Sequence, residues 1–188
     1  MEFVEGDEFH SKANIEKISS GRPLNDQDRE PWLERIRETM EQRTVRRPVC
    51  VQVEQSEAKR ECYGLVLTCS ALKKNYRDLL RGLRKPVREG ESGSETSFPG
   101  AEKQGESMAT YFVYVKGRKE LILPRMQKRK GHYMKSNMLD SQFDDLESPE
   151  GEGDVVVVDA EDDTQSQMDR AKEKFMVVAG DWFLKFLT

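Results

Sequence analysis

Residues 63–81 read YGLVLTCSALKKNYRDLLR, an apolar run that passes directly into a helical pattern. The run Tyr63–Thr68 is short and apolar on consecutive positions, which predicts a buried strand. From Ser70 to Leu83 the apolar residues recur at helical spacing, and Ser70 is a suitable N-cap. A strand that runs into a helix N-terminus is a natural anion site, because exposed N–H groups and the helix dipole favour negative charge there.

Similar runs elsewhere extend this pattern. Tyr111–Val115 and Val155–Val158 are apolar throughout, and Phe3–Glu5 is a shorter candidate strand. Continuous apolarity predicts strands that are buried on both faces, as in a parallel sheet covered by helices. Helical periodicity is seen over Pro31–Arg43 and again over residues 168–186. Strands that alternate with helices indicate a single doubly wound α/β domain over residues 1–188.

One segment breaks the alternation. Lys85–Ala109 is rich in Gly, Ser, Glu and Pro and has no apolar period. We expect residues 85–109 to be a flexible surface insertion between a helix and the next strand, because long loops cost little closure entropy.

Charge and cysteine content exclude several classes of protein. The formal net charge of −4 disfavours nucleic acid as a partner, since phosphate-backbone binding needs a broad positive surface. Cys50, Cys62 and Cys69 form no C-x-x-C pair, so neither a disulfide framework nor a zinc site is indicated. No apolar stretch approaches the ~20 residues of a membrane span, and the first residues lack a signal-peptide core. We therefore expect a cytoplasmic protein with no membrane partner.

Two clusters of polar residues lie near predicted strand ends. Asp7 follows the first candidate strand, where open α/β sheets bind ligands, and an Asp there can deprotonate a hydroxyl nucleophile. Arg29 offers a planar fork that suits a carboxylate. The alternative is that Asp26 and Asp28 cap a helix and pair with Arg29 on the surface, and spacing alone favours it. Lys73, in the second cluster, likewise fits either an anion site or a solvated helix face.

A third cluster is basic. Residues 125–133 read RMQKRKGHY, with positive charges ahead of a glycine hinge. Such a segment suits a mobile lid that closes on phosphates, although short basic runs also occur in nucleic-acid binders.

Taken in order, the clusters resemble gluconokinase, a small P-loop enzyme that phosphorylates D-gluconate. The matching segments are GD-x-x-H (6–10), N-x-x-K-x-x-x-G-x-PL-x-D-x-DR-x-PWL (14–33), CSALK-x-x-YRD-x-LR (69–81), R-x-x-x-R-x-GH-x-M (125–134) and L-x-SQF-x-x-LE-x-P (139–149). The resemblance implies a P-loop kinase-like doubly wound parallel sheet with helices on both faces. It also implies ATP and Mg²⁺ as cofactors, D-gluconate as substrate and a homodimer.

The resemblance assigns roles to individual residues. It implies that Asp7 positions the attacking hydroxyl and that Arg29 grips the substrate carboxylate. The gluconate pocket would be completed by His10, Ser70 and Lys73. Arg125 and Arg129, in a lid over residues 125–137, would neutralise charge on the transferred phosphoryl group. Glu5 stands where the family usually carries an Asp near the metal.

The family's phosphate-binding motif is missing from the sequence. Gluconokinases open with a strand and a G-x-x-x-x-G-K-[ST] loop, and the 188 residues contain no such motif. The resemblance implies that the sequence begins at the family's second strand, so we expect these residues alone not to transfer phosphate. The alternative function is a non-catalytic homologue that binds gluconate or a protein partner.

Overall fold

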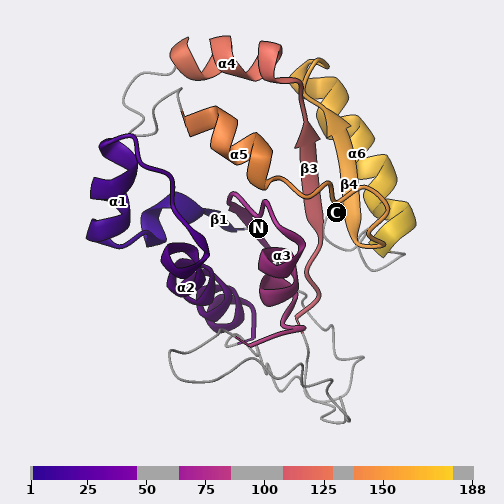
Figure 1. Cartoon of the computed structure of the whole chain (residues 1–188). Helices are drawn as coiled ribbons and strands as arrows, with labels where there is room; N and C mark the ends of the chain where they lie inside the picture. Colours follow the sequence, from indigo (N-terminus) through magenta and orange to yellow (C-terminus); the bar gives the residue numbers. More distant parts are fainter. Residues whose placement is uncertain (1, 46–63, 86–107, 129–137, 180–188) are drawn as a thin grey trace, which may run out of the picture.

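The computed structural model describes residues 2–45, 64–85, 108–128 and 138–179 (Figure 1). Its strands are β1 (Glu2–Glu5), β2 (Leu65–Thr68), β3 (Phe112–Lys116) and β4 (Val155–Asp159). Its helices are the 3-10 turn η1 (Gly6–Phe9), α1 (Lys12–Ser19), α2 (Asp26–Val45), α3 (Lys74–Arg81), α4 (Lys119–Lys128), α5 (Leu139–Asp145) and α6 (Thr164–Ala179). Strands and helices alternate as in the predicted α/β class. All four predicted strands are present.

The described strands form two parallel pairs, β1 with β2 and β3 with β4. Within the described residues no strand pairing joins β2 to β3, so the prediction of one continuous sheet is not met there. Figure 1 shows the two pairs in separate halves of the molecule, with α5 between them. The parallel pairing itself agrees with the predicted sheet type.

Burial on both faces, which the apolar runs predicted, was wrong for part of the sheet. Phe3 is 63% exposed and its register partner Val66 is 45% exposed. On β3, Val113 and Val115 are exposed, whereas their β4 partners are buried. The reason is that α6 packs on β4 and leaves alternate positions of β3 uncovered among the described residues.

Helix α2 begins five residues before the predicted Pro31 because of a reciprocal cap. The Asp28 backbone N–H donates to the Asn25 side chain, and the Asn25 N–H donates to the Asp28 carboxylate, both at 2.9 Å. This capping box satisfies two N–H groups that the first turn leaves unpaired. Pro31 is then accommodated inside the first turns of the helix.

The prediction that Ser70 caps the next helix was wrong. Helix α3 begins at Lys74 with Lys73 as N-cap, and that cap makes no side-chain hydrogen bond. Instead the Lys74 N–H donates to the carboxylate of Glu147 at 2.6 Å, from the segment after α5. A distant carboxylate therefore satisfies the helix start. Ser70 does not cap the helix and lies in the strand-to-helix connection.

The core lies where α2 packs on α3. Its buried side chains are Trp32, Leu33, Ile36, Tyr76, Leu79 and Leu80. The buried residues recur at helical spacing on both α2 and α3, so the apolar stripe of one helix packs against that of the other. This core fixes α2, which carries Arg29, against α3, which directly follows Lys73.

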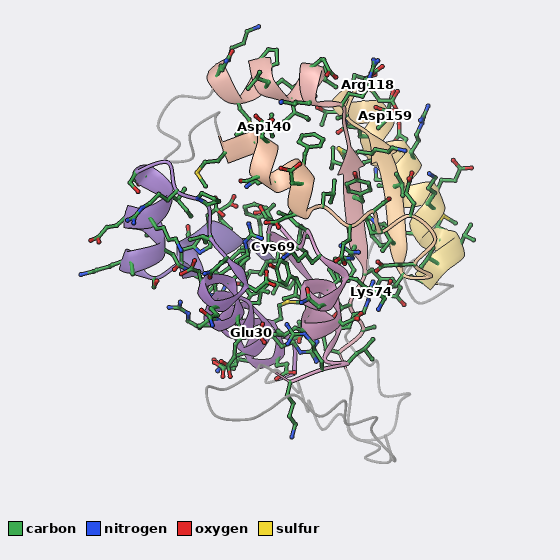
Figure 2. The ribbon with its side chains drawn as sticks, in the orientation of Figure 1. Glu30, Cys69, Lys74, Arg118, Asp140 and Asp159 are labelled. Carbon is green, nitrogen blue, oxygen red and sulfur yellow. The ribbon has the colours of Figure 1, made fainter. Side chains whose placement is uncertain are left out.

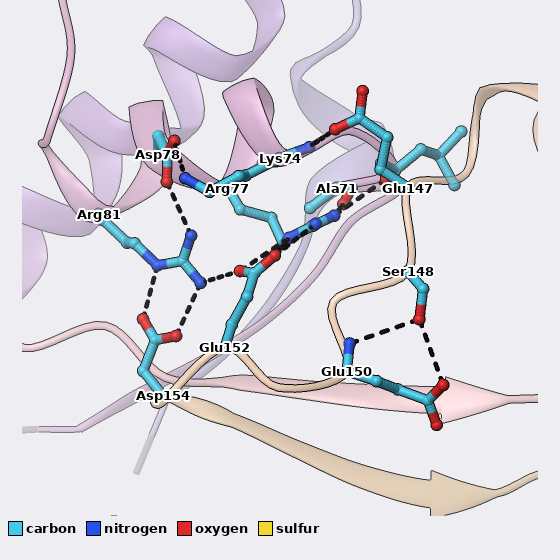
Figure 3. Close-up of polar contacts among 11 residues, drawn as sticks. Ala71, Lys74, Arg77, Asp78, Arg81, Glu147, Ser148, Glu150, Glu152 and Asp154 are labelled. Carbon is cyan, nitrogen blue, oxygen red and sulfur yellow. Dashed lines mark hydrogen bonds and ion pairs between the residues drawn. The ribbon is translucent and has the colours of Figure 1, made fainter.

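A network of ion pairs joins α3 to the loop before β4 (Figure 3). Arg77, whose side chain is 3% exposed, donates to the Glu152 carboxylate at 2.6 Å and to the carbonyls of Ala71 and Leu72 at 2.9 Å. Arg81 pairs with both Glu152 and Asp154. These contacts bind the β1–β2 half of the molecule to the β3–β4 half.

The remaining predictions fall partly outside the described residues. Residues 86–107 of the predicted insertion, 129–137 of the predicted lid and 180–186 of the last predicted helix lie outside them. Across the described segments, none of the helices combines the length and apolar character needed to cross a membrane.

Candidate functional site

The candidate site lies at the carboxyl ends of β1 and β2. Their last paired residues are Glu5 and Thr68, so Asp7 and Ser70 each follow two residues later. Gly6 makes this close approach possible, because a Cβ atom there would lie 2.1 Å from the Thr68 carbonyl oxygen. The sheet register thus brings the side chains of two distant motifs to one edge.

These side chains border a cavity that encloses about 390 Å³ of space, including its open mouth. Its lining combines ionisable, hydroxyl, amide and apolar groups. The lining residues are Asp7, His10, Ile18, Leu24, Arg29, Trp32, Ser70, Met138, Ser141 and Gln142.

His10 is held against Trp32 at the cavity wall. The two rings stack with centroids 4.4 Å apart, and the Trp32 Nε1–H donates to the Gly6 carbonyl at 2.8 Å. Burial lowers the pKa of His10, although the Asp7 carboxylate, 3.9 Å away, opposes this shift. The imidazole is therefore neutral at pH 7 and can both donate and accept a hydrogen bond with a sugar hydroxyl.

The lowered pKa of His10 predicts a pH-dependent stability. The unfolded chain binds a proton at His10 near pH 6.5, whereas the folded chain binds it only at lower pH. We therefore expect the contribution of His10 to the free energy of unfolding to be complete above this pH and to decrease as the pH falls below it. Urea unfolding between about pH 5 and about pH 7.5 measures the decrease, which His10→Gln should reduce. An unchanged decrease in the His10→Gln variant would contradict the prediction.

Arg29 reaches the cavity from the second turn of α2 and is buried. Its Nη1 donates to Asp145 at 2.8 Å and to the Tyr76 hydroxyl at 3.2 Å. Burial disfavours the charged guanidinium, but these two hydrogen bonds outweigh it and raise the pKa of Arg29. The alternative of surface pairing with Asp26 and Asp28 was wrong for Arg29, although Asp28 does cap the helix.

Lys73 lies next to the cavity without lining it. Its ammonium donates to Asp26 at 2.7 Å and lies 3.4 Å from Asp145. The hydrogen bond with Asp26 is the main cause that raises the pKa of Lys73. Lys73 is thus fully charged at neutral pH. Lys73 and Arg29 both pair with the carboxylate of Asp145.

Cys69 directly follows β2, at the start of the strand-to-helix connection, and lies near the centre of the molecule (Figure 2). Burial, with a smaller contribution from the Asp7 carboxylate, raises the pKa of its thiol to about 12. The thiol is protonated at neutral pH, so Cys69 is not a nucleophile.

Two further predicted site residues, Arg125 and Glu5, do not line the cavity. Arg125 Nη1 donates to the Ala160 carbonyl at 2.8 Å, near the end of β4, and Arg129 lies outside the described residues. The lid role of both stays a prediction. Glu5 accepts a hydrogen bond from the Thr68 hydroxyl. Among the described residues, no three His, Cys, Asp or Glu side chains are grouped to hold a metal ion.

Several residues that line the cavity could not be assigned to a site from their residue chemistry alone. Trp32 was assigned only to an apolar helix face, where its indole N–H gave no indication of its partner Gly6. Ser141 and Gln142 belong to the SQF segment, which was noted as a family motif without a role. The sequence feature that could have indicated them is a pair of polar residues beside Phe143 in a short helix.

Comparisons with known proteins place the chain among sugar-acid kinases. No family model matches the sequence. It is 35% identical over 162 residues to a probable gluconokinase of Schizosaccharomyces pombe, covering 86% of this chain and 67% of that protein. It is 37% identical over 158 residues to the thermoresistant gluconokinase of Escherichia coli, covering 84% and 69% of the two chains.

A solved structure agrees with these relatives. The crystal structure of a gluconokinase from Sinorhizobium meliloti superposes with a TM-score of 0.66 at 30% identity, covering 98% of this chain and 82% of that chain. The identity extends over most of the chain, and it accompanies a shared fold. The chain belongs to the gluconokinase family.

Proposed function

We propose that the cavity beyond β1 and β2 binds D-gluconate for phosphorylation by ATP. The observation that carries this proposal is that a carboxylate, Asp7, and a buried guanidinium, Arg29, border the same cavity. A kinase for a sugar acid needs both groups. One accepts a proton from the attacking hydroxyl, and the other binds the acid group of the substrate.

Asp7 is the proton acceptor in this proposal. It follows the end of β1 within η1, so it sits on backbone that the strand pairing and the Trp32 bond to Gly6 both fix. A carboxylate held in this way orients the hydroxyl and takes its proton as the new O–P bond forms. The neutral His10 and the Ser70 hydroxyl are suited to bind the other hydroxyl groups of the sugar chain.

Arg29 binds the substrate carboxylate. Its guanidinium is already desolvated and held by Asp145 and Tyr76, so little rotamer entropy is lost when an anion binds. Lys73 lies on the other side of the shared Asp145 carboxylate. A neutral sugar of the same length cannot pair with the guanidinium, so the arrangement favours an acid.

ATP supplies the phosphoryl group when it is bound, and Mg²⁺ accompanies it in kinases. The sequence holds no G-x-x-x-x-G-K-[ST] loop, and the described part of the chain has no cluster of metal-ligating side chains. Glu5 is suited to contribute a single carboxylate, since Mg²⁺ often takes one or two from the protein and the rest from phosphate and water.

The relatives named gluconokinase favour the enzyme over a non-catalytic homologue. The two alternatives share the gluconate site and differ in phosphate transfer. A homodimer and the cytoplasmic location stay part of the proposal.

Arg29→Lys tests the substrate assignment. We expect the Kd for D-gluconate to increase about 10- to 100-fold, because an ammonium cannot reproduce the two-pronged contact of a guanidinium with a carboxylate. Isothermal titration calorimetry with D-gluconate on the full chain measures this. The control is Arg22→Lys, on an exposed residue bonded to Ser20. Unchanged affinity in a folded Arg29→Lys variant would remove Arg29 from the substrate site.

A further inference from the structure

Five side chains beside the cavity form a closed ring of polar contacts. Arg29 donates to Tyr76, Tyr76 donates to Asp26, and Lys73 donates to the same Asp26 oxygen. Asp145 closes the ring, with Oδ2 2.8 Å from Arg29 and Oδ1 3.4 Å from Lys73. Two cations and two carboxylates make the ring formally neutral, and residues from α2, α3 and α5 contribute to it.

The ring uses one nitrogen of the Arg29 guanidinium. Within the described part of the chain, both hydrogen bonds of Arg29 start from Nη1, which has two hydrogens. Neither bond uses Nε or Nη2. These two nitrogens form the side edge of the fork, where two N–H groups point in parallel and match the two oxygens of a carboxylate.

Asp145 is the carboxylate that fixes this orientation. The Arg29 side chain is 8% exposed and Asp145 is its one ion-pair partner in the described segments. Tyr76 is neutral, because burial raises the pKa of its hydroxyl. Lys73, in contrast, keeps Asp26 as a closer partner. The contact for which Asp145 is indispensable is therefore the one with Arg29.

We propose that Asp145 is a positioning residue that selects for an acidic substrate by presenting the Nε–Nη2 edge of Arg29 to the cavity. This inference rests on the proposed function, since it assumes that Arg29 binds the sugar-acid carboxylate. Because the ring is formally neutral, the substrate carboxylate is selected by the direction of the N–H groups on Nε and Nη2 more than by net positive charge. Loss of Asp145 frees the guanidinium to rotate about its side-chain torsions, and the paired edge is lost.

Calorimetric titration of the full chain with D-gluconate and with D-glucitol tests this. D-glucitol has the same six-carbon chain with a hydroxymethyl group in place of the carboxylate. We expect Asp145→Asn, which keeps the side-chain shape, to weaken gluconate binding about 10- to 100-fold and to leave glucitol binding unchanged. Tyr76→Phe removes the other Nη1 contact and should weaken gluconate selectively by a smaller factor.

Asp144→Asn is the matched control, because it removes the same charge from the neighbouring, exposed position of α5. It should change neither ligand's affinity. Tighter gluconate binding in Asp145→Asn would show that Asp145 competes with the substrate, and equal binding would show that it has no role. Either result overturns this inference while the proposed function stands. If the unmodified chain does not prefer gluconate to glucitol, the proposed function fails, and the inference fails with it.

Discussion

Glu152→Gln is expected to lower the free energy of unfolding by about 2–4 kcal/mol. The change leaves the Arg77 guanidinium, 3% exposed, without a carboxylate partner, and it also weakens the pairing of Arg81. Burial alone would raise the pKa of Glu152, but hydrogen bonds from the two arginines lower it. The effect is large because this network joins two halves that no described strand pairing connects.

Thermal and urea unfolding measure the loss, which corresponds to a decrease in Tm of roughly 5–15 °C for a domain of this size. Glu150→Gln is the matched control, since it removes the same charge two residues away. Its partner is Lys116, and both side chains are about half exposed, so we expect a much smaller loss than for Glu152→Gln. Equal losses in the two variants would show that the buried network adds nothing beyond a surface ion pair.

The strands could be predicted from the sequence, whereas their surroundings could not. An apolar run such as residues 155–158 is rich in β-branched side chains and too short for a helix, so local composition decides its structure. Whether both faces are covered depends on which helices pack there. Val113 on β3 is as apolar as its buried partner Val156, and only the position of α6 distinguishes them.

The start of α2 was predicted five residues too late, although its cap is local. Asn25 and Asp28 are three residues apart, and their spacing alone is compatible with the capping box that starts α2. The start of α3 depends on Glu147, which is 73 residues away in the sequence. No local pattern around Ser70 could show that a distant carboxylate would replace it as the cap.

The candidate site likewise combines features that local sequence predicts with contacts between distant residues that it does not predict. Asp7 and Ser70 meet because the carboxyl ends of parallel strands share one edge, a rule that needs only the strand assignments. Arg29 was assigned to the substrate by resemblance, and its partner Asp145 lies 116 residues away. That contact depends on how α5 lies against α2, and the burial of Arg77 against Glu152 depends on how the loop before β4 lies against α3. Periodicity specifies neither arrangement.

Asp7→Asn is expected to lower kcat by about 10²- to 10⁴-fold while changing the KM for gluconate little. Asparagine keeps the shape and most of the hydrogen bonding of the side chain but cannot accept the proton of the attacking hydroxyl. The effect should therefore fall on an interaction made mainly in the transition state. The measurement is coupled ADP release in a fusion of the chain to the strand, phosphate-binding loop and helix with which the family begins.

Glu8→Gln is the control, because it removes the same charge from the exposed neighbouring position of η1 and should leave kcat unchanged. A structural role for Asp7 predicts a different pattern, in which the melting temperature falls and the folded fraction keeps its kcat. Melting curves beside steady-state kinetics separate the two. A normal kcat in Asp7→Asn would require another proton acceptor, and Asp7 is the one carboxylate that lines the described cavity.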